Sequence, residues 1–381
     1  MKTRGWCPDL YTPMAAGDGF LVRVKPEVAG VSAAQLRMLA DAVRAYGSGR
    51  VEITNRGNFQ VRGLSDETVP EFAKAMLAAG LASADPAVER RRNILVHVPV
   101  APEMLRVTQG LEAWVKADES LAALPGKFGF AVGGMGADIN VLPGGVVLPG
   151  GYATAVEPVA AVQALTWAFL HLAGADVTRM EALVAAVGAE AVFAEAGLPM
   201  QLVQMPGAVP QVGPMASGFG LGVGFGQLDA AMLRHAAGLS EQFGDGWLRT
   251  TSARSLVVMG TGENTGAIAI EAQAVGFITA PDDVRLRIVA CAGLPACPQG
   301  LMDARALATR LAPHWAGSGV LHVSACAKGC AVPGGAAVTL VAEGETYNVV
   351  LNGRARDVPA VAGLSLDETV QWMRERRLCH E

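Results

Sequence analysis

The sequence predicts an α+β fold with two pseudo-symmetric ferredoxin-like half-domains, each of order βαββαβ, and two α/β subdomains. The same order of strand-like and helix-like stretches occurs twice in the 381 residues. Two 15-residue stretches, 49–63 and 246–260, each begin and end with glycine and share a central threonine, Thr54 and Thr251. After each unit come a helical stretch, a strand and a glycine-rich turn, so the repeat continues beyond the half-domains.

The elements of each unit follow from residue periodicity. The first unit is predicted to contain, in order, strand 19–26, helix 31–47, paired strands 49–63, helix 67–80 and closing strand 91–99. The second is predicted to contain strand 218–226, helix 228–244, paired strands 246–260, helix 266–276 and strand 284–293. Ser32 is the expected N-terminal cap of the first helix, and the polar turn 55–58 joins the first pair of strands.

The segments after the two units differ in chemistry. Residues 124–136 read "LPGKFGFAVGGMG", while residues 319–335 read "GVLHVSACAKGCAVPGG". We therefore expect "CAKGC" to be the second-half counterpart of the Lys127 region. A glycine-rich loop at 142–152 and a helical linker at 181–197 are expected between the halves. The predicted domains are a first half-domain at 1–98, a first α/β subdomain and linker at 99–210, a second half-domain at 211–290 and a cluster-binding subdomain at 291–381.

Charge and hydropathy exclude several classes of partner. A net charge of −5 argues against nucleic acid, because neutralising phosphates needs a basic surface. The most apolar long stretch, 161–174, is too short to span a bilayer and contains His171, so we expect a buried helix and no membrane association. The N-terminus has no apolar signal-peptide core, so a cytoplasmic location is expected. Cytoplasmic thiols stay reduced, so paired cysteines indicate a metal or redox site before a disulfide.

Four of the six cysteines form two pairs with the spacing C-x5-C-x28-C-x3-C: Cys291, Cys297, Cys326 and Cys330. Four thiolates can bind Zn²⁺ or a [4Fe–4S] cluster. Structural zinc sites prefer closer pairs, so the spacing favours the cluster over zinc and over unrelated buried thiols. Cys297 is expected near the N-terminus of a helix at 299–312, where the helix dipole favours an anionic ligand. Cys7 and Cys379 are interpreted as ordinary thiols.

The cysteine spacing on a duplicated ferredoxin-like scaffold resembles the sulfite and nitrite reductase family, which couples a [4Fe–4S] cluster to sirohaem. The resemblance implies that Cys330 also bridges the cluster to the sirohaem iron. "TNRGNFQ", "RRNIL" and "GKFGF" are similar to the family segments that bind the tetrapyrrole and its substrate. They imply catalytic or substrate-binding roles for Arg56, Arg92 and Lys127. The second lysine of the last segment is replaced here by Gly129, which weakens a site for a small anion.

Further substrate-binding candidates are Arg23, Asn58 and Lys328, the last lying between two of the cysteines. Simpler interpretations remain open. Arg56 can be a solvated turn residue, Arg90 to Arg92 a surface patch, and Lys127 a side chain that snorkels past Phe128.

The N-terminal sequence "GWCPDLYTPMAAGDGFLVRV" resembles the precorrin-3B synthases, the branch of the family in aerobic cobalamin biosynthesis. That resemblance implies precorrin-3A as substrate in the sirohaem position, hydroxylation of C20 with O2, and γ-lactone formation from the ring A acetate. It also implies an oxygen-activating centre, thought in the family to be a mononuclear iron. The implied electron donor is NAD(P)H or a reductase or ferredoxin.

The residues themselves leave parts of that chemistry open. No G-x-G-x-x-G follows a first strand, and no 2-His-1-carboxylate set is evident by spacing; His97 and His322, on predicted strands, are the histidines of interest. Two alternatives stand beside the main hypothesis. One is a sulfite or nitrite reductase with resident sirohaem. The other is a non-catalytic iron–sulfur, zinc or tetrapyrrole-binding protein.

Overall fold

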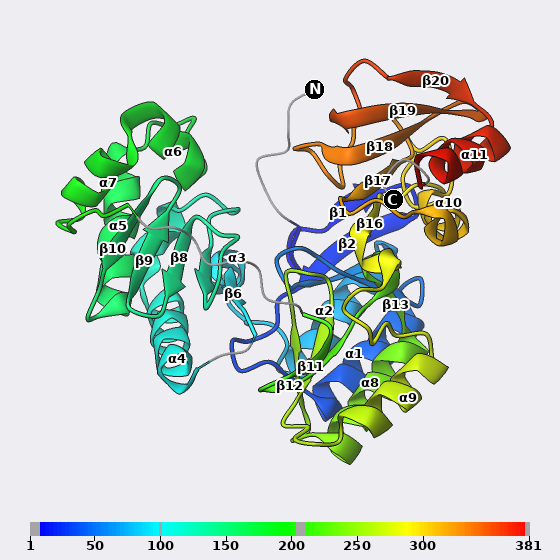
Figure 1. The fold of residues 1–381 in the computed structure, drawn as a ribbon. Coiled ribbons are helices and arrows are strands. Elements are labelled where there is room, and N and C mark those ends of the chain that lie inside the picture. The colour runs from blue at the N-terminus through cyan, green and yellow to red at the C-terminus, as the bar shows by residue number, and fades with distance from the viewer. Residues whose placement is uncertain (1–7, 99–100, 203–210, 378–381) are drawn as a thin grey trace.

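The computed structural model describes residues 8–98, 101–202 and 211–377, which form four five-stranded sheets (Figure 1). Two sheets belong to ferredoxin-like half-domains, which confirms the predicted α+β class. The other two belong to α/β subdomains and lie on different sides of the half-domains in Figure 1. Among the described residues, no helix combines the length and apolar character needed to cross a bilayer.

Up to residue 80, the first half-domain forms where its strands and helices were predicted. Its elements are β1 Met14–Ala16, β2 Gly19–Val24, β3 Val31–Ser32, α1 Ala33–Tyr46, β4 Arg50–Ile53, β5 Phe59–Leu64 and α2 Thr68–Ala78. Ser32 caps α1 as expected: its side chain accepts the backbone N–H of Gln35, whose own side chain accepts the N–H of Ser32. Leu36, Leu39 and Val43 recur at helical spacing and are fully buried.

The second half-domain repeats this plan. Its elements are β11 Gly213–Met215, β12 Gly218–Leu221, the 3₁₀ turn η2 Gly224–Gly226, β13 Gln227–Asp229, α8 Ala230–Phe243, β14 Trp247–Thr250, β15 Leu256–Met259 and α9 Thr265–Ala274. α1 and α8 pack on each other, so Leu39 of one half and Leu233 of the other share one hydrophobic core. The halves therefore fold as one body.

Each half-domain completes its sheet with a strand from the other half. β13 pairs with β4 at the edge of the order β1-β2-β5-β4-β13, and β3 pairs with β14 at the edge of β11-β12-β15-β14-β3. The expectation that 91–99 and 284–293 close these sheets is wrong. β6 Ile94–Val96 and β16 Ile288–Ala290 pair instead with the α/β strands β7 and β17. The exchanged strands already satisfy the edges of β4 and β14, so no closing strand is needed there.

The two α/β subdomains have the same sheet topology. The first contains α3 Pro86–Arg91, β6, α4 Pro102–Ala117, η1 Glu119–Ala123, β7 Phe130–Val132, β8 Ile139–Leu142, β9 Gly145–Leu148, β10 Gly151–Thr154, α5 Pro158–Leu172, α6 Met180–Val187 and α7 Ala189–Glu195. The second contains η3 Val284–Arg287, β16, α10 Ala304–Leu311, η4 Ala312–His314, β17 Leu321–Ser324, β18 Ala336–Glu343, β19 Thr346–Gly353, β20 Val361–Leu364 and α11 Leu366–Arg377. In both, three parallel strands are followed by two antiparallel ones.

Two expectations about the middle of the chain need revision. Residues 142–152 are not a loop, because they form most of the β9 and β10 hairpin. Residues 181–197 form α6 and α7, which pack on α5 as part of the first α/β core. The apolar stretch at 161–174 lies largely in α5, whose residues Val162, Leu165 and Phe169 are buried in that core, as predicted.

Candidate functional site

Two adjoining hollows lie where the first half-domain meets the first α/β subdomain. The first, of about 330 Å³, and the second, of about 400 Å³, share Arg56, Asn58, Ile94 and Leu95 in their linings. Lys127 lines the first hollow and Arg92 the second. Four of the predicted substrate residues therefore lie together, although they come from three separate segments of the chain.

The turn between β4 and β5 positions Arg56 and Asn58. The Thr54 hydroxyl accepts the backbone N–H groups of Arg56, at 3.3 Å, and of Asn58, at 3.1 Å. Gly57 has a φ of +67°, a left-handed conformation that glycine adopts at little cost. The Arg56 guanidinium donates to the Lys127 carbonyl oxygen at 2.9 Å. This bond joins two sequence motifs that are far apart in the chain, and it contradicts the interpretation of Arg56 as a merely solvated turn residue.

Gly129 sits where a side chain has no room. A Cβ added there would lie 2.9 Å from the Asn93 carbonyl oxygen, closer than real Cβ contacts allow. The Asn93 side-chain amide donates to the carbonyl oxygens of Gly126 and Phe128, which holds the two segments at this separation. The packing around Gly129 therefore leaves no room for the lysine that the family segment has at this position.

Asp138 and Arg179 also line the first hollow, and no sequence motif marks either residue. The buried Asp138 carboxylate accepts three N–H donors: Gly129 N at 3.0 Å, Arg179 Nε at 2.8 Å and Met180 N at 2.9 Å. The Arg179 side chain is 37% exposed. The two residues are 41 positions apart, so no local motif marks their pairing.

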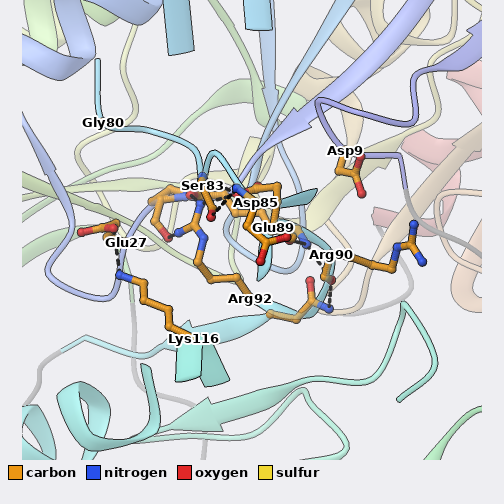
Figure 2. A network of polar contacts seen from close by, with 12 residues as sticks. Asp9, Glu27, Gly80, Ser83, Asp85, Glu89, Arg90, Arg92 and Lys116 are labelled. Atoms are coloured by element: carbon orange, nitrogen blue, oxygen red, sulfur yellow. Dashed lines mark hydrogen bonds and ion pairs between the residues drawn. The ribbon is translucent and has the colours of Figure 1, made fainter. Parts of the chain in front are cut away.

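Arg92, which lines the second hollow, is buried in a polar network (Figure 2). Its guanidinium donates to the Lys25 carbonyl oxygen at 2.8 Å and to the Glu89 carboxylate at 3.0 Å. The Lys25 ammonium in turn donates to the carbonyl oxygens of Glu89 and Arg90. Removing one partner of such a buried pair costs about 3–5 kcal/mol, so Arg92 supports the wall of the hollow as well as lining it. Since Arg91 is also buried, the interpretation of Arg90 to Arg92 as a surface patch is wrong.

Arg249, on β14 of the second half-domain, is a third lining residue that the sequence did not single out. It is 9% exposed, and its guanidinium donates to the Val28 carbonyl oxygen. Burial lowers its pKa from the ordinary value. The second half-domain thus contributes a cation, together with Thr250, to a hollow whose other described lining residues come from the first half.

Arg23 and Lys328 line neither hollow. Arg23 donates to the Gln60 side chain at 3.0 Å, and Gln60 donates to Glu52 at 2.6 Å. Burial favours a raised pKa for Glu52, but the charges of Arg305 and Arg62 outweigh it and the pKa is lowered. Because Arg305 lies on α10, this polar group ties the first half-domain to the cysteine-bearing subdomain.

The four paired cysteines gather at the carboxyl ends of β16 and β17. Cys291 follows β16 directly, and its sulfur accepts the backbone N–H of Ala325 at 3.2 Å. Burial raises the pKa of the Cys291 and Cys330 thiols, and Cys326 and Cys297 raise both further, whereas Lys328 opposes the shift at Cys330.

The donor set fits a [4Fe–4S] cluster in its chemistry. Four thiolates and no other donor match the ligands of a [4Fe–4S] centre, in which each cysteine binds a different iron. Within the described ranges, no three His, Cys, Asp or Glu side chains gather closely enough to hold one metal ion. Cys297 does not lie at a helix N-terminus, since α10 begins at Ala304 with Asp303 as its cap. Cys7 and Cys379 lie outside the described residues.

The two strand histidines differ in surroundings. His97 follows β6, and burial lowers its pKa, partly offset by a hydrogen bond with the Met135 backbone. His322, in the middle of β17, is fully buried, and burial lowers its pKa to about 4. Neither of its ring nitrogens has a hydrogen-bond partner in the described part of the chain.

The expected equivalence of "CAKGC" and the Lys127 region is wrong. Lys127 precedes β7, whereas Cys326 follows β17. The counterpart of the cysteine loop is therefore the glycine-rich turn 133–136, which follows β7.

Comparisons with known proteins agree with this architecture. The nitrite/sulfite reductase ferredoxin-like half domain matches residues 12–79, which contain β1 to α2. Precorrin-3B synthase from Sinorhizobium sp is 32% identical over 391 residues, covering 94% of this chain and 84% of that protein. Ferredoxin–nitrite reductase from Leptolyngbya laminosa is 30% identical, covering 42% of this chain and 37% of that enzyme.

A solved structure extends the likeness in fold to nearly the whole chain. The Mycobacterium tuberculosis NirA protein superposes with a TM-score of 0.68 at 17% identity, covering 93% of this chain and 79% of that one. Birch chloroplast ferredoxin–nitrite reductase is 25% identical, and the match spans only 61% of its length.

Proposed function

Because the chain belongs to the precorrin-3B synthase branch of the nitrite and sulfite reductase family, we propose that it hydroxylates precorrin-3A at C20 with O2 and closes a γ-lactone with the ring A acetate. One oxygen atom enters the macrocycle and the other leaves as water, which consumes two electrons and two protons. The donor is NAD(P)H or a reductase or ferredoxin, and the reaction takes place in the cytoplasm.

The observation that carries the proposal is the convergence of Arg56, Asn58 and Lys127 on one hollow. A polycarboxylate macrocycle explains why a protein with a net charge of −5 gathers cations there. Arg56 and Lys127 would bind and orient carboxylate arms, with Arg56 fixed by its bond to the Lys127 backbone. Arg92 and the backbone around Lys25 would keep that wall rigid and exclude water behind it.

We assign the cluster to Cys291, Cys297, Cys326 and Cys330. When bound, it would supply single electrons to the reaction. The fold leaves the sulfur of Cys291 as an acceptor for the Ala325 N–H, a bond that stabilises a thiolate ligand. No triad of side chains in residues 8–98, 101–202 and 211–377 fits a mononuclear iron.

The test is turnover of precorrin-3A by purified protein with a reduced donor, with and without O2. We expect a product heavier by one oxygen atom that carries ¹⁸O when ¹⁸O2 is supplied. Equal product formation without oxygen would rule out the hydroxylation.

A second candidate, a sirohaem-dependent sulfite or nitrite reductase, is favoured by the half-domain match at 12–79. The absence of a side chain at Gly129 counts against it, because reduction of a small anion needs concentrated positive charge. Sharp chlorin-type absorption bands in the purified protein, together with sulfite or nitrite reduction, would support this candidate and not the first.

A further inference from the structure

A third cation, Arg179, lies in the first hollow and has no assigned role. It comes from the end of the segment before α6 and lines the hollow together with Arg56 and Lys127. Among the lining residues that the structure describes, three carry a cation and one, Asp138, carries a carboxylate. The Asp138 carboxylate accepts three N–H donors, one of them from Arg179.

The geometry of Arg179 leaves part of its guanidinium available. Asp138 engages only Nε, at 2.8 Å, and among the described residues the two terminal nitrogens have no hydrogen-bond partner. The Asp138 side chain that holds Nε is 1% exposed, whereas the Arg179 side chain is 37% exposed. The guanidinium is therefore anchored on its inner edge and presents its outer edge to whatever enters the hollow.

The apolar lining strengthens such a contact. Ile94, Leu95 and Phe130 contribute to the same hollow, and Leu95 and Phe130 are almost fully buried. A charge pair formed beside these side chains is less screened by water than one on an open surface.

We propose that Arg179 binds a carboxylate arm of the substrate macrocycle and that Asp138 acts as its positioning residue. This role deepens the proposed function, because the carboxylate belongs to the tetrapyrrole. Gly129 contributes no side-chain cation to this wall of the hollow. Arg179 contributes one close by, because its Nε and the Gly129 N–H both donate to the Asp138 carboxylate. The hollow is then specific for a carboxylate held by Arg56, Lys127 and Arg179 from different segments.

The test is equilibrium binding of uroporphyrin III, a stable octacarboxylate macrocycle, followed by tryptophan fluorescence quenching without O2 or donor. We expect Arg179→Gln to weaken binding about five- to tenfold, the usual effect of one charge-assisted contact. Arg179→Lys keeps a cation for Asp138 but loses the forked donor, so a smaller loss of about two- to threefold is expected. This second variant keeps the test valid if Arg179→Gln folds poorly.

The matched control is Arg285→Gln. Arg285 also pairs with an aspartate through Nε, at 2.9 Å, and its side chain is 42% exposed, but it lines neither hollow. Its variant should bind uroporphyrin like the wild type. The loss in Arg179→Gln should persist in part at 1 M NaCl, because salt screens a partly buried charge pair less than an exposed one. A loss of equal size in both variants would overturn the assignment.

Asp138→Asn tests the positioning role. If Asp138 acts through Arg179, the double variant with Arg179→Gln should bind no more weakly than the weaker of the two single variants. Additive losses would contradict this coupling.

The outcomes separate this assignment from the proposed function. Wild-type affinity in Arg179→Gln overturns the role of Arg179 and leaves the hydroxylation standing. Intact uroporphyrin binding that depends on Arg179, in a protein that does not convert precorrin-3A, supports Arg179 and counts against the hydroxylation. Failure of the wild type to bind the macrocycle overturns the carboxylate site itself.

Discussion

The sheets β6–β10 and β16–β20 share one topology but carry different chemistry. His97 and Cys291 are equivalent in position, each directly after the first strand. The His97 N–H donates to the Val132 carbonyl oxygen at 2.9 Å, and the Cys291 N–H donates to that of Val323 at 3.1 Å. His97 bonds to the Met135 backbone, as the Cys291 sulfur bonds to the Ala325 N–H. One scaffold position thus holds an imidazole in one sheet and a thiol, that of Cys291, in the other.

The loops after the parallel strands account for the difference. After β16, residues 291–303 precede α10, whereas only 97–101 separate β6 from α4. In the first sheet, the His97 ring fills the space above the next turn: a Cβ on Gly134 would lie 2.5 Å from its Cγ. The longer loops of the second sheet leave room for four cysteines. The two sheets therefore differ in their loops, while their strands have the same pairing.

The largest effect should come from removing a cysteine of the second sheet. We expect Cys326→Ser to abolish the cluster, because a hydroxyl is a poor ligand for iron in place of a thiolate. Iron and acid-labile sulfide content, with visible absorption, measure the loss. Cys379→Ser is the control and should keep full cluster content. If Cys326→Ser also kept it, the ligand assignment would be wrong.

The next effect concerns His322, whose equivalent in the first sheet is Ala131. Both are fully buried on the second strand, paired with Val289 and Leu95 respectively. Burial lowers the pKa of His322 to about 4, below the unfolded value near 6.5, so the unfolded state binds the proton first. The contribution of the neutral His322 side chain to the free energy of unfolding is present above about pH 6.5 and is lost as the pH falls toward 4.

We therefore expect His322→Leu to remove this pH dependence. Relative to the variant, the wild type should lose roughly 3 kcal/mol of unfolding free energy between pH 6.5 and 4. Guanidinium unfolding of both proteins from pH 8 to pH 4.5 measures the difference. Parallel curves for the two proteins would show that His322 does not titrate in this way.

Local patterns predicted the elements well but not their partners. The Ser32 cap, the turn at Thr54 and the two strand pairs depend on neighbouring residues, and all formed as expected. The exchange of β3 and β13 between halves could not be predicted, because the partner of a sheet edge is decided by tertiary packing.

The candidate site shows the same difference between features that local sequence predicts and features that depend on tertiary packing. Spacing alone grouped the four cysteines, and the resemblance of short motifs brought Arg56 and Lys127 together. Neither the spacing nor the motifs could show that Arg92 is bonded to Glu89, because the burial of that pair depends on how α3 packs. Both also missed Arg179, whose partner Asp138 lies in a distant turn.

A smaller effect should follow from adding a side chain at Gly129. Ala at this position would press on the Asn93 backbone, so we expect Gly129→Ala to lower the unfolding free energy by about 1–3 kcal/mol. Gly126→Ala is the control, since its Cβ would meet only the Arg90 side chain at 3.8 Å. Thermal unfolding compares the two. Equal melting temperatures would mean that the wall can yield, and that a lysine could be restored there.

The smallest effect is expected for Lys127→Ala, which removes one cation of the first sheet without touching the second. The backbone bond from Arg56 to Lys127 does not involve the lysine side chain, so the turn should keep its shape. Uroporphyrin binding should weaken about fivefold, roughly 1 kcal/mol, while cluster content stays at the wild-type level. Parallel titration and iron analysis check both parts. Unchanged affinity would mean that the Lys127 side chain only snorkels past Phe128 and does not bind the macrocycle. Loss of the cluster would show that the two sheets are not chemically independent.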